Sequence, residues 1–132
     1  MNKVKQYHLR FEVTTISNQQ KPVVISNRIN GFSVNSELAT FLNDIGPNYA
    51  QEVINEIIQI DFRQYINNQF IHSIPSCFDQ EDVELFSSPN RASFNDTNGG
   101  YVDIPLQDFL EILQEWKSFL ENLPFKYYYA DK

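Results

Sequence analysis

Hydrophobic and polar positions alternate with a period of two near the start of the chain. Aromatic or aliphatic side chains occupy every second position from Tyr7 to Val13, with polar side chains between them, which is typical of a strand with one buried face. Residues 17–22 predict a turn, after which the alternation resumes. Asn30 and Gly31 form a dipeptide that favours a tight hairpin turn. Residues 1–34 are therefore predicted to form an antiparallel meander.

From residue 35 onward the apolar positions recur every three or four residues, which indicates helices. Asn35 or Ser36 can cap the first helix. Gly46 suits a left-handed helix end, and Pro47 suits the first turn of a second helix. The alternation over residues 58–62 would also fit a strand. We nevertheless expect the second helix to continue to about residue 66, because apolar or aromatic side chains then share one face: Ile54, Ile58, Phe62, Tyr65 and Ile66.

The remainder of the chain predicts short strands followed by a long helix. The strands are expected over Phe70–Ile74, over Val83–Phe86 as an edge strand, and in a hairpin that pairs Arg91–Asp96 with Tyr101–Ile104. An amphipathic helix is predicted from about Gln107 to Asn122, with Trp116 on its buried face. Pro124 ends this helix, and the alternation from Phe125 to Tyr129 predicts a closing strand.

These elements predict the α+β class: an antiparallel β-sheet with two or three packed α-helices, the last of them an amphipathic C-terminal helix. The chain has 132 residues, of which 42% are hydrophobic and 14% aromatic. We expect a single domain over residues 1–132, because two domains would each have a marginal core. No apolar run approaches the roughly 18 residues of a membrane span, and the N-terminus does not resemble a signal peptide. A cytoplasmic protein without membrane contact is expected.

Few residues suggest catalysis or metal binding. His8 and His72 have no further ligand-type residues at metal-binding spacing, and the single cysteine, Cys77, excludes a multi-cysteine zinc site. The acidic segment 79–84 lacks the glycine that a calcium loop requires. We therefore expect no catalytic residue, no metal and no cofactor. A small hydrolase that uses His72 with Cys77 or with a carboxylate is the enzymatic alternative.

The net charge of −7 is distributed unevenly. Residues 1–78 hold six acids and six bases, whereas residues 79–132 hold eleven acids and four bases, so the second segment carries the whole net charge. An acidic protein without clustered lysines and arginines is not expected to bind nucleic acid directly. The acidic surface formed by residues 79–132 is either simply solvated or a patch that attracts a basic partner.

The segment from Gly100 to Glu121 combines a short strand, an Ile-Pro-Leu entry and a helix with the pattern Phe-Leu-Glu-Ile-Leu-x-Glu-Trp-x-x-Phe-Leu. It resembles the end of many small bacterial immunity proteins, which protect cells against polymorphic toxins, including those of contact-dependent growth inhibition systems. The resemblance implies an inhibitor that binds a cognate toxin domain, commonly a nuclease, and blocks its active site. In such families this helix is chiefly scaffold, so the resemblance assigns no binding residue.

We expect the toxin to contact the acidic loop, residues 79–84, and the neighbouring hairpin of residues 91–104. Loops can enter a concave active site, and carboxylates attract the cations that hold phosphates. The acids of the last helix (Asp108, Glu111 and Glu115) are the alternative, although a solvated helix face is the simpler interpretation of them. Alternatively, the protein is an adaptor or a subunit of a larger assembly, in which case the same residues would bind a partner other than a toxin. The expected partner-binding residues are Asp79, Glu81, Asp82, Glu84, Asp96, Tyr101 and Asp103.

Overall fold

Two hairpins and a four-stranded antiparallel sheet make up the β-structure of the residues that the structure describes. This computed structural model describes residues 2–76, 82–95 and 101–127. The hairpins are β1 (Leu9–Ile16) with β2 (Gln19–Ser26), and β3 (Arg28–Ile29) with β4 (Phe32–Ser33). The sheet contains four strands in sequential order: β5 (Phe70–Ile74), β6 (Val83–Phe86), β7 (Arg91–Asn95) and β8 (Tyr101–Pro105).

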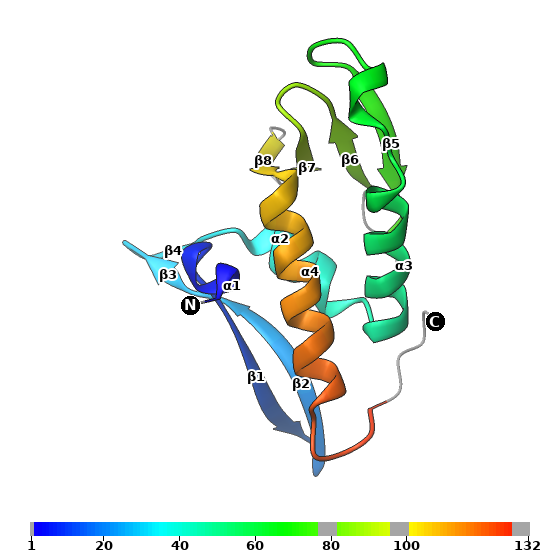
Figure 1. Cartoon of the computed structure of the whole chain (residues 1–132). Helices are drawn as coiled ribbons and strands as arrows, with labels where there is room; N and C mark the ends of the chain where they lie inside the picture. Colours follow the sequence, from blue (N-terminus) through cyan, green and yellow to red (C-terminus); the bar gives the residue numbers. More distant parts are fainter. Residues whose placement is uncertain (1, 77–81, 96–100, 128–132) are drawn as a thin grey trace.

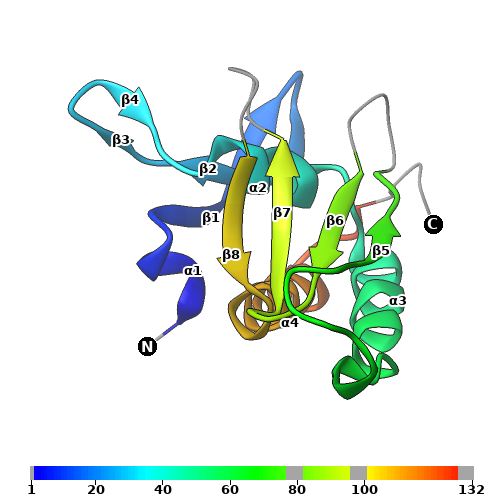
Figure 2. The ribbon, with the colours of Figure 1, turned by 90° about the horizontal axis from the view of Figure 1, so that it is seen from above.

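Four α-helices complete the described structure, which confirms the predicted α+β class. They are α1 (Lys3–Gln6), α2 (Ser36–Asn43), α3 (Pro47–Ile58) and α4 (Leu106–Glu121), and a short 3₁₀ turn, η1 (Phe62–Gln64), follows α3. Helix α4 runs from the four-stranded sheet at one end to the β1–β2 hairpin at the other, alongside α3 (Figure 1). Seen from above, α2 and α4 lie behind the sheet (Figure 2).

The core forms where the inner face of the sheet meets these helices. Alternate residues of the paired strands, among them Leu85, Ala92 and Ile104, are fully or almost fully buried there. The ring of Phe94 on β7 meets Phe109 on α4 edge to face, with 5.6 Å between ring centroids. Edge-to-face pairs add to the free energy gained from apolar burial. The sheet is therefore held to the helices through one face only.

Trp116 of α4 connects the separate parts of the core. It is fully buried, and its indole nitrogen donates a hydrogen bond to the carbonyl oxygen of Ile45, between α2 and α3, at 3.1 Å. The ring of Phe11 on β1 lies 4.9 Å from the Trp116 ring, and the ring of Phe119 stacks on it at 5.7 Å. One side chain thus joins α4, the first hairpin and the α2–α3 junction.

The N-terminal helix α1 has no counterpart in the sequence prediction, which assigned Tyr7 to the first strand. The carboxylate of Glu115 accepts hydrogen bonds from the backbone nitrogens of Lys3 at 2.6 Å and Val4 at 2.9 Å, and so holds the start of α1 on α4. The Tyr7 hydroxyl donates to Asp108 at 2.5 Å, and the Lys3 ammonium lies 3.3 Å from the same carboxylate. Asp108 and Glu115 therefore have a structural role and do not form a merely solvated helix face.

Helix α2 begins at Ser36, as predicted, but the capping contacts of α2 and α3 and the end of α3 differ from the prediction. Asn35 makes no side-chain cap to α2, and its amide instead donates to the backbone oxygen of Tyr7 at 2.8 Å. Gly46 has φ −93° and ψ −178°, so it begins α3 in an extended conformation and is not a left-handed helix end. Helix α3 ends at Ile58 and does not reach residue 66, because the Asp61 side chain accepts from the Arg63 backbone nitrogen and starts a new turn.

Three strand predictions need correction as well. The two N-terminal hairpins do not form one continuous meander, since β1–β2 and β3–β4 are separate two-stranded sheets. Strand β6 is not an edge strand, because β5 pairs with it on the side away from β7. The chain forms no strand over residues 122–127, and Tyr129 lies outside the described residues. The predicted Asn30–Gly31 turn and the β7–β8 hairpin are confirmed.

Replacing Trp116 with alanine should lower the free energy of unfolding by about 3–5 kcal/mol, because it removes a fully buried ring from the junction of three elements. Trp116→Phe should cost less, since most of the apolar volume is kept and chiefly the hydrogen bond to Ile45 is lost. Chemical denaturation of both variants measures the two costs. An unchanged midpoint for Trp116→Ala would contradict this assignment of the core.

The pKa of Tyr7 is raised well above its usual value of 10.0, first by burial and then by the hydrogen bond to Asp108 and the charge of that carboxylate. Because the folded-state pKa exceeds the unfolded one, the stability contributed by Tyr7 is fully present below pH 10 and is lost as the pH rises above it. The stability difference between wild type and Tyr7→Phe should therefore be constant near neutral pH and shrink at alkaline pH. Urea denaturation over a pH series tests this, and a constant difference would contradict it.

Candidate functional site

The four-stranded sheet has a second face, which points away from the helices. Successive strand residues point to opposite faces, so the neighbours of the buried core positions lie on this face. The register places them in cross-strand rows, because Glu84 pairs with Ser93 and Ser93 pairs with Asp103. We call this surface the outer face and define it by its residues: Phe70, Ser73, Glu84, Phe86, Arg91, Ser93, Asn95, Tyr101 and Asp103. Figure 2 views the sheet with α2 and α4 behind it.

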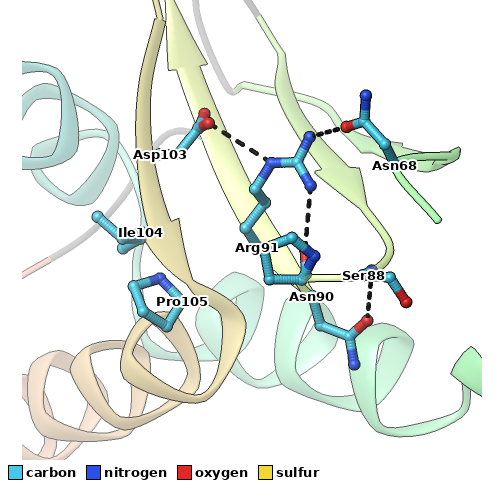
Figure 3. Close-up of a pocket in the computed structure, with 8 residues that line it drawn as sticks. Asn68, Ser88, Asn90, Arg91, Asp103, Ile104 and Pro105 are labelled. Atoms are coloured by element: carbon cyan, nitrogen blue, oxygen red, sulfur yellow. Dashed lines mark hydrogen bonds and ion pairs between the residues drawn. The ribbon is translucent and has the colours of Figure 1, made fainter.

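Arg91 is the central cation of the outer face, and all three nitrogens of its guanidinium group contact oxygen atoms. Its Nε lies 3.4 Å from Asp103 Oδ2, and Nη1 donates to the backbone oxygens of Pro89 at 3.0 Å and Ser87 at 3.3 Å. Nη2 donates to the side-chain oxygen of Asn68 (Figure 3). The carbon at the centre of the guanidinium lies 4.8 Å from the centroid of the Phe86 ring, within reach of a cation–π contact. Arg91 therefore organises the site and has little capacity left for an anionic ligand.

Ser87 fixes the segment that forms one wall of the site. It is fully buried, and its hydroxyl donates to the backbone oxygen of Ile66 and accepts from the Gln69 backbone nitrogen at 3.2 Å. Two backbone hydrogen bonds, from Asn68 to Ser87 at 3.0 Å and from Ser87 to Gln69 at 2.9 Å, extend this attachment. The buried hydroxyl thus has both donor and acceptor partners, as a buried polar group requires. The wall beside Arg91 is consequently held to the sheet.

A pocket of about 570 Å³ opens beside Arg91, and Figure 3 shows the side chains that line it. Asp103 is half exposed there, and it accepts a hydrogen bond from Ser93 Oγ at 2.6 Å in addition to its contact with Arg91. An ionised carboxylate has roughly four lone-pair positions, so Asp103 can still accept from a ligand. The pocket therefore suits a hydrogen-bond donor better than an anion. Its lining residues are Asn68, Ser88, Pro89, Asn90, Arg91, Asp103, Ile104 and Pro105.

The structure brings several of the predicted binding residues together. Glu84, Tyr101 and Asp103 share the outer face, and Asp82 lies exposed directly before β6. Tyr101, which the sequence analysis predicted as a binding residue, is 63% exposed. Asp79, Glu81 and Asp96 lie outside the described residues.

Sequence reasoning missed the residues that organise this surface. Arg91 was predicted only as the start of a strand, although it is the only base between Arg63 and Lys117, a signal that could have identified it. Phe70 and Phe86 were also treated only as strand residues. Their rings meet edge to face at 5.8 Å, and Phe70 is 46% exposed. The outer face thus combines aromatic rings with carboxylates.

A second cluster contains the predicted histidine candidate. His72 Nε2 on β5 lies 3.2 Å from Glu56 Oε2 on α3, and each side chain is about half exposed. A pocket of about 380 Å³ lies beside the pair, and its remaining lining residues are Gln59, Ile60, Tyr65 and Ile71. The sequence did not reveal this carboxylate partner, because the two residues lie on different elements. Cys77, the other hydrolase candidate, lies outside the described residues, and His8 is exposed before β1.

Within residues 2–76, 82–95 and 101–127, no three histidine, cysteine, aspartate or glutamate side chains gather as they would around a metal ion. None of the helices described is both long enough and apolar enough to cross a membrane. No protein-family model matches the sequence, and neither a curated protein nor a solved structure is significantly similar to it.

Arg91→Ala should lower the free energy of unfolding by about 1–3 kcal/mol, because it removes several hydrogen bonds and the stacking on Phe86. Asp103→Asn is the matched variant. It keeps an acceptor for Ser93 but removes the charge, and a half-exposed ion pair contributes about 1 kcal/mol or less. Urea denaturation measures the free energy of unfolding of both variants, and equal losses in the two would contradict the structural role given to Arg91.

Proposed function

We propose that this protein is a binding protein that neutralises a toxin domain by covering it with the outer face of the four-stranded sheet. One observation carries the proposal: the fold leaves this face of the sheet free of helices and equips it with carboxylates and exposed aromatic rings. Exposed apolar or aromatic patches rimmed by polar residues are typical of protein–protein interaction sites.

The charges of the outer face favour a basic partner. Within the described part of the chain, Asp82 and Glu84 make no ion pair, whereas Asp103 is paired with Arg91. Unpaired carboxylates attract a cationic surface over a distance and raise the rate of association. A nuclease holds the phosphates of its substrate with cationic side chains, so the acidic face is chemically suited to its active site.

The aromatic residues supply the apolar part of such an interface. Tyr101 lies at the start of β8 beside Asn95, and Phe70 lies at the start of β5 beside Phe86, so the two exposed rings lie toward opposite corners of the outer face. The row that contains Glu84 and Asp103 lies between them. Tyrosine is enriched among the residues that dominate binding energies. The resemblance of residues 100–121 to immunity proteins supports a toxin as the partner.

Two other functions remain alternatives. An adaptor or a subunit of a larger assembly would use the same face for a different partner. A small hydrolase is favoured only by the contact between His72 and Glu56, which resembles a base oriented by a carboxylate. Both of these side chains are about half exposed, and Tyr65 is the only hydroxyl among the other residues that line the adjacent pocket. The binding proposal therefore has the broader support.

The experiment uses the toxin domain of the protein encoded immediately upstream, where the partner of an immunity protein is expected. Expression of the wild-type chain should protect cells from this domain, and the purified proteins should bind. Asp82→Lys with Glu84→Lys should lower the association rate roughly tenfold or more at low ionic strength, and should flatten its dependence on salt. Stopped-flow fluorescence measures both effects.

The matched control is Glu52→Lys with Glu121→Lys, which changes the net charge equally on exposed helix positions away from the outer face. This control should retain most of the association rate. Equal losses in both double variants would show an effect of net charge alone and would contradict the outer face as the interface. Absence of both binding and protection by the wild type would overturn the toxin proposal. If His72→Ala folds but fails to protect, the hydrolase becomes the better explanation.

A further inference from the structure

The hairpin of β3 and β4 forms an exposed arm, which we define as residues Arg28–Ser33. It extends away from the rest of the molecule, beyond the β8 side of the sheet (Figures 1 and 2). Ile29 pairs with Phe32 across the arm, and these side chains are 41% and 76% exposed. Asn30 and Gly31 adopt positive φ angles of 53° and 84°, which form the tight turn between them. The arm thus presents two large apolar side chains to solvent.

Hydrogen bonds anchor the base of this arm. The Val34 backbone nitrogen donates to the Asn27 oxygen at 3.1 Å, and the Asn27 nitrogen donates to the His8 oxygen at 2.8 Å. The Asn35 amide fixes the following residue to the Tyr7 backbone, as described above. A projection that is held in place loses less conformational entropy on binding than a free loop does. The arm is therefore suited to insertion into a complementary groove.

The arm differs in charge from the rest of this acidic protein. The sequence contains no acid between Glu12 and Glu37, and Arg28 lies at the base of the arm. Arg28 is exposed and makes no ion pair within the described part of the chain. A suitable groove would accordingly be apolar and would carry a free carboxylate at its rim.

The molecule contains such a groove between α3, η1 and the start of α4. It has a volume of about 400 Å³, and Ile58 at its border is 65% exposed. Gln107 lines the groove and donates a hydrogen bond to Glu111 Oε2 at 3.5 Å. Glu111 makes no ion pair with any residue that the structure describes. The lining is mostly apolar and consists of Ile57, Ile58, Ile60, Phe62, Asn90, Pro105, Leu106, Gln107 and Leu110.

We propose that the arm of one copy of this chain docks into the groove of a second copy, with Phe32 in the apolar pocket and Arg28 beside Glu111. The arm does not occupy the groove of its own molecule, because it extends away from the molecule beyond β8 and its Phe32 side chain is 76% exposed (Figure 2). Since the arm and the groove lie on different sides, the contact is head-to-tail. Repeated head-to-tail contacts produce open chains or rings.

This proposal does not depend on the identity of a toxin. The groove adjoins the pocket beside Arg91 at Asn90 and Pro105, but most of its apolar lining comes from α3, η1 and α4. A result for self-association therefore leaves the proposed toxin binding to be decided by its own experiment.

Sedimentation velocity over about three decades of protein concentration tests the proposal. The weight-average mass of the wild type should rise above 15.5 kDa with concentration. Phe32→Ser in the arm and Ile58→Lys in the groove should each abolish this rise. Both replace exposed side chains, so circular dichroism should confirm an intact fold. Ile16→Ser, which removes an exposed apolar side chain from the other hairpin, is the control and should associate as the wild type does.

Mixing the two defective variants provides the sharpest test. The Phe32→Ser chain keeps an intact groove and the Ile58→Lys chain keeps an intact arm, so one contact can form between them. The mixture should reach no more than twice the mass of one chain, because the remaining arm and groove are both defective. A mixture that stays monomeric would overturn the pairing of arm with groove.

A charge exchange tests the polar contact. Arg28→Glu and Glu111→Arg should each weaken association at least severalfold, and the double variant should restore it because the pair is then reversed. A wild type that remains monomeric at every concentration would overturn the proposal. Association of Phe32→Ser at the wild-type level would overturn it as well, since the exposed ring would then have no part in the contact.

Discussion

The position of helix α4 depends on the burial of Trp116, and the rest of the structure depends on the position of α4. A buried indole needs a partner for its nitrogen as well as apolar neighbours, and the Ile45 carbonyl and the ring of Phe11 meet these needs from different elements. Once α4 is fixed there, its first turns meet the inner face of the sheet through Phe109. The outer face is left open because the helices cover the opposite one.

The elements predicted correctly from the sequence are those whose formation is determined by their own residues and does not depend on distant contacts. The C-terminal helix, the Asn30–Gly31 turn and the β7–β8 hairpin belong to this group. Helix α1 could not be predicted, because four residues do not form a stable helix alone. Its start depends on the carboxylate of Glu115, more than a hundred positions further along the chain. The end of α3 was missed because the local turn at Asp61 prevailed over an apolar pattern that continues past it.

The candidate site shows the same division between local and distant information. Alternation along β6 and β8 is sufficient to place Glu84, Tyr101 and Asp103 on one face, since strand periodicity is a local property. The role of Arg91 is only partly local: Pro89 and Ser87 directly precede it, but Asn68 comes from the turn before β5 and Asp103 from the neighbouring strand β8. Asp103 therefore differs from Glu84 in a way that the sequence does not reveal: a cation already balances Asp103, whereas Glu84 has no such partner among the described residues.

The fold also changes how the acidity of the C-terminal segment is distributed. Several acids of this segment are occupied within the molecule, since Asp108 contacts Lys3, Glu121 contacts Lys117 and Glu115 holds the start of α1. Three described acids after residue 81 neither form an ion pair nor accept a hydrogen bond from a backbone nitrogen: Asp82, Glu84 and Glu111. Glu84 lies on the outer face, Asp82 lies directly before its strand β6, and Glu111 lies beside the groove that suits the arm. Within the described residues, the unpaired acids of this segment therefore occupy two separate positions, and each lies near exposed apolar or aromatic side chains that a partner could cover.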